Sequence, residues 1–344
     1  PSNFSIEGEF AQLIAGHSGD IGSNGSVYLD DFESSESSTN LAVASLWQLA
    51  STPVSIMGKD VGGSKLTTEY NAHRAHMAWY RIDNLFTSQT SSFTPSHIKN
   101  DLVQLSDHRV RQINFDEIYP NKELEYGATG ILDILNLAYY PTQRGSYNVS
   151  ASRIGRDGRL IEPESNWGGM MRSLDVTNFE SANYEYMEFW MMDPFVEIEG
   201  DPTWRPNNEG KLVLQLGEIS EDILKDGFKS FENGIDVNGD QTAIKETLWG
   251  RVSTRTSTVY AFDNSADSHK AQDVGLNGLS TEDEKKFATY SNYVDTLRNK
   301  VDAEVLNAWV ADPFSPVNDP AGDNYSYYRG SKWDDTAASI LQRY

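Results

Sequence analysis

Three acidic residues near the start of the sequence have the chemistry of a calcium site. Asp30, Asp31 and Glu33 lie in the run VYLDDFESS, whose first residues alternate between apolar and polar side chains as in a strand. Calcium is bound by about six to eight oxygen atoms, many of them from carboxylates. We therefore expect that no cofactor is required and that calcium is the ion this cluster would hold. The alternative is an acidic strand end that faces water.

A second acidic run begins like an EF-hand loop. Asp236, Asn238 and Asp240 place oxygen-bearing side chains at alternate positions, as the first half of that loop requires. The match then fails, because Gln241 stands where the loop needs glycine and Thr247 stands where it needs a bidentate glutamate. We interpret the run as a polar turn.

The histidines offer little for a metal. His73 and His76 are three residues apart, and His108 stands alone. A zinc site would need a third ligand from elsewhere in the chain. In a strand, two residues separated by an odd number of positions point to opposite faces. We therefore expect structural or solvated histidines.

Glu185 and Glu188 are the acids that most resemble a catalytic pair, because they lie in the aromatic segment near Trp190. Two carboxylates near the scissile bond are typical of glycoside hydrolases. Their odd separation again places them on opposite faces of a strand, so they cannot act as one pair. The sequence also lacks a nucleophile elbow, a P-loop and a dinucleotide fingerprint. We predict no catalytic residue and a protein that is not an enzyme.

Tryptophans are the candidate ligand-binding residues. Trp167 and Trp190 lie in the run NWGGMMRSLDVTNFESANYEYMEFWMMDPF, and Trp47 and Trp79 precede it. Aromatic faces stack on sugars, so Trp167 and Trp190 could form part of a carbohydrate platform. The alternative is that all four pack in the core. Exposure of the rings distinguishes the two interpretations.

The amino-acid composition excludes some classes of partner and of chemical site. The chain of 344 residues has 51 acidic and 28 basic residues, a net charge of −23 and no cysteine. Such a charge repels nucleic acid and anionic lipid surfaces, so we expect no nucleic-acid partner. The lack of cysteine excludes disulfides, thiolate metal sites and a cysteine nucleophile.

The elements that would position these residues are mainly strands. Apolar and polar residues alternate, or aromatic residues cluster, in segments bounded by turn residues, which is typical of strands. These segments are residues 74–83, 131–141, 184–192, 211–220 and 247–254. The segment 184–192 is apolar on both faces apart from its glutamates, which indicates a strand covered by layers on both sides.

One helical region stands out near the end. Ser280 and Asp283 form a capping box, and apolar residues then recur at helical spacing from Phe287 to Trp309, where Asp312 and Pro313 follow. A shorter helix is expected near residues 97–107. The fold class is therefore mainly β, a jelly-roll or galactose-binding-like β-sandwich with long insertions and a C-terminal helical segment. We expect a flexible lead-in at 1–26, the sandwich at 27–260 with a partly helical insertion around 84–120, and a docked helical and irregular extension at 261–344.

Several segments together resemble the SprA/Sov family, the outer-membrane translocons of the type IX secretion system that serves protein export and gliding motility. The most specific are AYYP-x-x-RG-x-YN and FW-x-MDPF. The matching stretches are residues 27–35, 74–86, 110–123, 135–148, 166–195, 211–234, 247–252, 272–284 and 323–331. They follow the family's order. The chain departs from the pattern at Ser146, where a proline is expected, and at 236–240.

The resemblance implies a function and a place. Family members form a very large barrel through which folded cargo leaves the periplasm, so this chain is expected to be an internal soluble piece that begins at Pro1 and ends in the helix-like run TAASILQRY. It would be a non-enzymatic structural or gating domain in a cap over the barrel, on the cell-surface side of the outer membrane rather than the periplasmic side. Its partners would be other barrel segments, shuttle and plug subunits, and secreted cargo proteins. The alternative is a carbohydrate-binding β-sandwich or a remote glycosidase-like protein.

Overall fold

The computed structural model describes residues 39–124, 127–176, 178–179, 184, 186–193, 209–230, 243–254, 265, 272 and 274–344. The chain divides into two compact units, Pro1–Asn40 with Leu174–Met192, and Leu41–Ser173 with Asp193–Tyr344. In the smaller unit, the hydroxyls of Thr39 and Tyr184 lie 2.6 Å apart. The larger unit contains every helix and strand given below. The domain boundaries expected from the sequence stay predictions.

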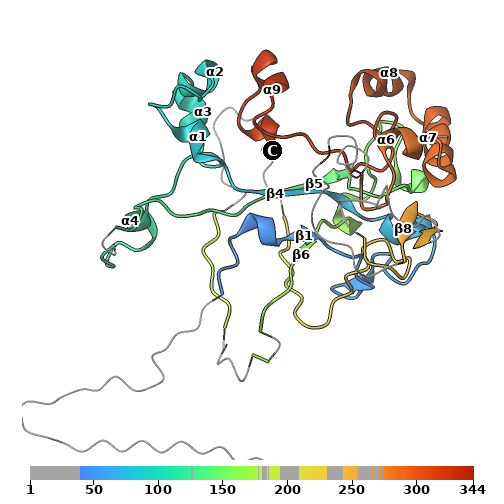
Figure 1. The fold of residues 1–344 in the computed structure, drawn as a ribbon, viewed down its shortest axis with the longest axis horizontal. Helices are drawn as coiled ribbons and strands as arrows, with labels where there is room; N and C mark the ends of the chain where they lie inside the picture. Colours follow the sequence, from blue (N-terminus) through green and yellow to red (C-terminus); the bar gives the residue numbers. More distant parts are fainter. Residues whose placement is uncertain are drawn as a thin grey trace, which may run out of the picture. The chain divides into compact units, whose positions relative to one another are not determined.

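The larger unit consists of short helices and short strands joined by loops (Figure 1). The strands are β1 (Gln48–Leu49), β2 (Ser55–Ile56), β3 (Lys59–Asp60), β4 (Ala75–Tyr80), β5 (Asn136–Arg144), β6 (Met170–Met171), β7 (Ile244–Glu246) and β8 (Arg251–Ser253). The α-helices are α1 (Asn84–Thr87), α2 (Ser96–Lys99), α3 (Leu102–Ser106), α4 (Phe115–Ile118), α6 (Thr281–Glu284), α7 (Ala288–Lys300), α8 (Ala303–Ala311) and α9 (Ser331–Asp335). Among the described residues, none of these helices has the length and apolarity to span a bilayer.

The prediction of a mainly β jelly-roll or galactose-binding-like sandwich is wrong. The described strands pair only two at a time, as β1–β6, β2–β3, β4–β5 and β7–β8, and each pair is antiparallel. A sandwich needs two sheets of several strands whose inner faces share one core. Here the longest helix, α7, supplies much of the core instead.

Two expected sandwich strands explain the error. Residues 211–220 form no strand in the structure, and Leu212, Leu214 and Leu216 are exposed. The described residues of 184–192 also form no strand, and most of their large apolar side chains are exposed. Alternation and aromatic content show that a segment suits a covered strand, but the partner strand must come from elsewhere in the chain. Local pattern alone does not reveal whether that partner is present.

The strand pair β4–β5 crosses the middle of the larger unit (Figure 1). The sequence predicted a strand at 74–83, and β4 confirms it; β5 starts later than predicted and continues through Pro141 to Arg144. Trp79 lies opposite Leu137, and the register shifts between Ala75 and His76. A proline is tolerated in a two-stranded pair because one edge of each strand has no ladder to maintain.

The main core lies against α7. Tyr290, Tyr293, Val294 and Leu297 recur at helical spacing and are buried, which buries one stripe of the helix as an amphipathic pattern requires. The Ser280 half of the predicted capping box is confirmed, because the side chain of Ser280 accepts a hydrogen bond from the Asp283 amide at 3.3 Å. The Asp283 carboxylate instead accepts from Arg251 at 2.8 Å. The predicted long helix is divided in three, α6, α7 and α8.

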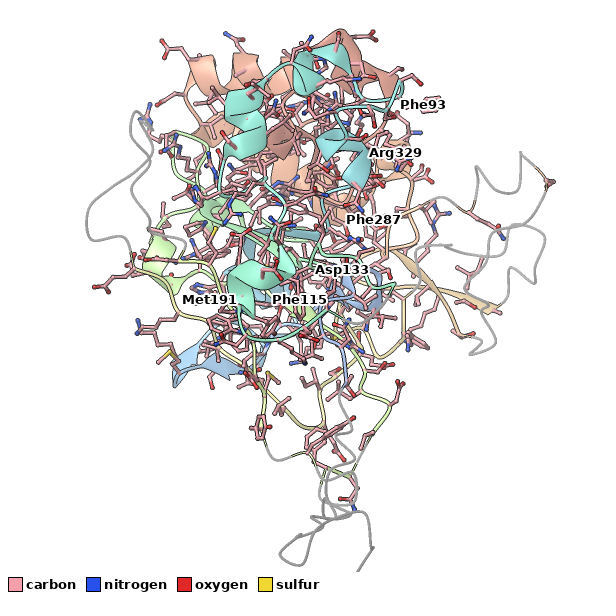
Figure 2. The ribbon with its side chains drawn as sticks, turned by 90° about the vertical axis from the view of Figure 1, so that its left-hand side faces the viewer. Phe93, Phe115, Asp133, Met191, Phe287 and Arg329 are labelled. Atoms are coloured by element: carbon pink, nitrogen blue, oxygen red, sulfur yellow. The ribbon has the colours of Figure 1, made fainter. Side chains whose placement is uncertain are left out.

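A second core fastens the end of the chain to the helices α1–α3. It contains Phe86, Ile98, Val110 and Ile340, with Tyr328 and Tyr344 packed against it. In this part of the unit Phe93 lies at the surface and is 83% exposed (Figure 2).

Candidate functional site

Three carboxyl groups meet inside the larger unit. One oxygen each of Glu284, Asp319 and Asp323 lies within 4.8 Å of the other two, and we call these residues the acidic triad. Glu284 is the last residue of α6 and is fully buried, whereas Asp319 and Asp323 come from the loop between α8 and α9. In the described chain this is the one group of three or more carboxylates and histidines close enough to share an ion.

The loop itself uses one member of the triad. The Asp319 carboxylate accepts hydrogen bonds from the amides of Gly322, Asp323 and Asn324 at 2.9, 3.3 and 3.2 Å. This is the local pattern by which aspartate fixes a turn. Gly322 has φ +75°, a left-handed conformation that suits glycine. The hydrogen bonds of Asp319 therefore serve mainly to fix the shape of this loop.

The other two members are held by neutral donors. Glu284 accepts from the Asn277 side-chain amide at 2.8 Å and from the Ala321 backbone amide at 3.2 Å. Asp323 accepts from the Tyr147 hydroxyl at 2.7 Å. Neutral donors satisfy the oxygens but do not cancel their charge.

Two backbone features bring these groups together. Gly275 faces the Asp323 carboxylate so closely that a Cβ built on it would lie 1.9 Å from Oδ2. Tyr147 holds a left-handed φ of 61°, which is uncommon for a tyrosine, and its hydroxyl also accepts from the Leu276 amide at 2.8 Å. Strained backbone of this kind persists where the surrounding contacts determine it.

Arg144 lies beside the loop that carries Asp319 and Asp323. Its guanidinium donates to the backbone carbonyl of Pro320 at 2.7 Å and to that of Asp319, and it lies 5.6 Å from the ring centroid of Tyr293. Burial, and then repulsion between the carboxyl groups, raises the pKa of Glu284 far above its ordinary value. The pKa of Asp323 is raised for the same reasons, with Arg144 opposing the shift.

The triad has two chemical possibilities. Protonated, it shares hydrogens among close carboxyl groups, as coupled acids do. Ionised, its oxygens are the ligand type that a hard cation such as calcium takes. Asp319 already accepts three amide bonds, so any cation would depend mainly on Glu284 and Asp323.

The sequence did not identify this site. Asp319 and Asp323 flank a Pro-Ala-Gly turn, which is a local signal, but nothing local links them to Glu284 at the end of α6. The predicted calcium residues Asp30, Asp31 and Glu33 lie outside the described residues, as do Asp236, Asn238 and Asp240.

The two candidate tryptophans lie in very different surroundings. Trp167 is 7% exposed and carries the Arg74 guanidinium 4.8 Å from its ring centroid, so it offers no open face to a sugar. Trp190 belongs to the smaller unit and is 66% exposed. Trp47 and Trp79 are half-buried.

The predicted histidines do not gather. His73 lies 3.1 Å from the Ser165 carbonyl, His76 stacks on Tyr140 with centroids 5.5 Å apart, and His108 lies 3.5 Å from Asp107. Glu188 is exposed, and Glu185 is outside the described residues. None of these histidines belongs to a three-ligand cluster in the part of the chain that the structure covers.

Comparison with known proteins adds no relative. A scan against models of protein families finds no match, and a search of curated proteins finds no similar sequence. Function must therefore be argued from the residues and their surroundings.

Proposed function

We propose that this chain is a non-enzymatic structural and gating region of an outer-membrane protein-secretion translocon of the type IX system, similar to SprA/Sov. The support from the sequence is the set of matching segments in one order across the chain. The partners would be other segments of the same translocon, its shuttle and plug subunits, and passing cargo. The proposed location is the cell-surface side of the outer membrane.

The observation that carries the proposal is the exposure of large apolar residues in segments without regular structure. In the smaller unit these residues are Tyr186, Phe189, Trp190, Met191 and Met192. Soluble proteins rarely leave contiguous apolar surface of this kind in water unless it contacts a partner. A region that packs against further translocon segments would cover it.

A similar run lies in the larger unit. Leu212, Val213, Leu214, Leu216 and Ile219 are exposed within eight positions. Neighbouring residues of an extended chain point to opposite sides, so exposure of 212, 213 and 214 means that both sides are open. An extended segment with two open apolar sides suits insertion between layers of a larger assembly.

The triad does not favour catalysis. Its carboxyl groups are occupied by Asn277, Tyr147 and backbone amides. Catalytic acids must reach a substrate, whereas Glu284 is fully buried.

The test uses the full-length parent protein in its own cells. Replacing Trp190 or Leu214 by glutamate places a charge on an apolar surface that the proposal assigns to packing, so secreted cargo in the medium should fall several-fold. Ser106→Glu adds the same charge at an exposed polar position of α3 and should leave secretion unchanged. Normal export in both apolar-to-glutamate variants, at normal protein levels, would refute the packing role.

The location has a separate test. A protease site inserted beside Asn299, an exposed residue of α7, should be cut in intact cells if this face lies outside. Cutting only after permeabilisation would assign the chain to the periplasmic side.

Carbohydrate binding is the second candidate, and the exposure of Trp190 is the observation in its favour. Calorimetric titration with oligosaccharides tests it. Micromolar binding that Trp190→Ala abolishes would establish a glycan site, and no heat at millimolar sugar would remove the candidate.

A further inference from the structure

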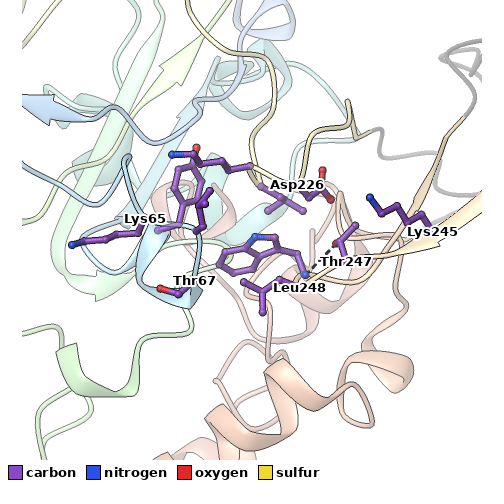
Figure 3. A pocket seen from close by; sticks show the side chains of 11 residues that line it. Lys65, Thr67, Asp226, Lys245, Thr247 and Leu248 are labelled. Atoms are coloured by element: carbon purple, nitrogen blue, oxygen red, sulfur yellow. Dashed lines mark hydrogen bonds between the residues drawn. The ribbon is translucent and has the colours of Figure 1, made fainter.

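A pocket of about 210 Å³ lies in the larger unit, and no member of the triad lines it (Figure 3). Three segments that are distant in sequence line it, within residues 65–70, 224–226 and 245–249. Sites for drug-sized molecules are usually about 300–1,000 Å³. This pocket is therefore the size of a single residue or a similar small group.

The floor of the pocket is apolar and belongs to the packed core. Tyr70, Leu224 and Trp249 line it, and all three are buried members of the main core. The rim is apolar as well, because Leu66 is 77% exposed and Leu248 is also exposed. A ligand with an apolar group would cover this surface.

One side of the pocket is cationic. Lys65 lies there with Thr67, and its side chain extends outward from the other lining residues (Figure 3). Lys225 also lines the pocket, and its ammonium is restrained because it donates to the Gly63 carbonyl and lies 5.5 Å from the Tyr70 ring centroid. An ammonium has three N–H donors, so Lys225 can bond Gly63 and still donate to an anion.

The other side combines hydrogen-bond acceptors with a third ammonium. Asp226 and Thr247 carry acceptor oxygens, and Lys245, which can only donate, lies beside them (Figure 3). The Asp226 carboxylate accepts from the Phe228 amide at 3.1 Å, and burial raises its pKa. Among the residues that the structure describes, the lining holds three lysines and one aspartate, in a chain whose net charge is −23. The attraction for anions is therefore local, which suits a small anion and not a polyanion.

We infer that this pocket binds the C-terminal residue of a peptide, or an N-acylated amino acid of the same chemistry, with an apolar side chain. The carboxylate would lie toward Lys225 and Lys65, the amide N–H toward Asp226 and Thr247, and the side chain between Leu66, Leu248 and Trp249. A carboxylate, an amide and an apolar group together match the three kinds of surface that the pocket presents. This inference does not depend on the proposed function.

A matched pair of probes tests the carboxylate. N-acetyl-leucine and N-acetyl-leucinamide differ only in the terminal group, and both would be titrated calorimetrically into the whole chain. We expect the acid to bind at least tenfold more tightly than the amide, with an advantage that shrinks as salt screens the lysines. Equal affinity for acid and amide, or no binding of either at millimolar concentration, would overturn the inference.

Variants locate the binding. Lys225→Gln should weaken N-acetyl-leucine binding by about tenfold and Lys65→Gln by a smaller factor, whereas Lys59→Gln on β3, which does not line the pocket, should leave it unchanged. Lys225→Gln also removes a bond to Gly63, so its thermal midpoint is measured in parallel. Unchanged affinity in both pocket variants would place the binding elsewhere and refute this site.

A longer probe distinguishes the two sources. If the natural ligand is the end of a peptide, N-acetyl-Ala-Ala-Leu should bind several-fold more tightly than N-acetyl-leucine. Equal affinity would assign the pocket to a free acylated amino acid, and weaker binding of the tripeptide would exclude a chain end.

Discussion

At the scale of single residues, the acidic triad predicts how stability depends on pH. The folded state raises the pKa of Glu284 above its ordinary value of 4.5, so between that value and the raised one the folded chain holds more protons than the unfolded chain. Stability therefore falls as pH rises through this window. We expect the free energy of unfolding in urea to be lower at pH 8 than at pH 5 by roughly 2–4 kcal/mol.

Substitution identifies the group responsible. Asp323→Asn removes a charge that repels Glu284, so the pH dependence should become flatter, whereas Asp295→Asn on the exposed side of α7 should leave its slope unchanged. The competing account is an ionised triad around a cation. If calcium raises the midpoint of urea unfolding at pH 8, and if Asp323→Asn abolishes that rise, the triad binds a cation and does not share protons.

Arg74 is the second residue with a large predicted effect. It is fully buried, burial lowers its pKa to about 10, and it donates to Asn71, Thr52 and the Ala50 carbonyl. Arg74→Lys cannot satisfy these separate acceptors, so we expect a loss of roughly 2–4 kcal/mol in urea unfolding.

The control for Arg74 is an arginine whose hydrogen bonds lie at the surface. Arg156 donates twice to Asp302 at 2.6 and 2.9 Å, but its side chain is exposed. Arg156→Lys should cost less than about 0.5 kcal/mol. Similar losses at both positions would mean that burial of Arg74 is not what matters.

At the scale of elements, the helical region from α6 to α8 shows what local sequence can and cannot predict. Ser280 as a helix cap and the apolar stripe from Phe287 were readable because both are short-range patterns. The break in the helix after Lys300 could not be predicted from local sequence. It depends on a distant contact, in which the backbone carbonyl of Arg156 accepts a hydrogen bond from the Asp302 amide at 2.9 Å. A contact between residues so far apart in sequence leaves no periodic trace.

Packing of α8 depends on a glycine in the 155–160 turn. Gly158 has φ +77°, and an added Cβ would lie 2.7 Å from Trp309 and 2.8 Å from Val305. Gly127 has φ +86° with open space around it. Gly127→Ala should therefore cost about 1 kcal/mol from the backbone alone, and Gly158→Ala about 2–4 kcal/mol because of the clash. Equal losses in thermal unfolding would show that α8 can move away from the turn.

At the scale of the whole chain, the sequence predicted segments better than their assembly. The strand at 74–83 and the helix near the end were found, but the sandwich was not, because the segments 211–220 and 184–192 carry strand-like patterns without described strand partners. The acidic triad was missed for a related reason, since Glu284 and Asp319 meet only through the fold.

The described part of the larger unit has two hydrophobic cores, which predicts that it opens in two steps. Tyr344 stacks on Tyr80 and Tyr328 with centroids 4.6 and 4.9 Å apart, and its hydroxyl accepts from the Asp83 amide at 3.0 Å. These contacts hold the second core, whereas α7 belongs to the first. Tyr344→Ala should therefore speed amide hydrogen exchange in α1–α3 at least tenfold and leave α7 protected.

Hydrogen exchange resolves the two cores because each contributes its own amides. Tyr325→Ala removes an exposed tyrosine of the same C-terminal segment, so it should change hydrogen exchange neither in α1–α3 nor in α7. If Tyr344→Ala instead accelerates exchange in α7 as much as in α1–α3, the unit unfolds as one cooperative body. In that case the C-terminal tyrosine stabilises the whole unit, and loosening of α1–α3 cannot occur without loss of the core around α7.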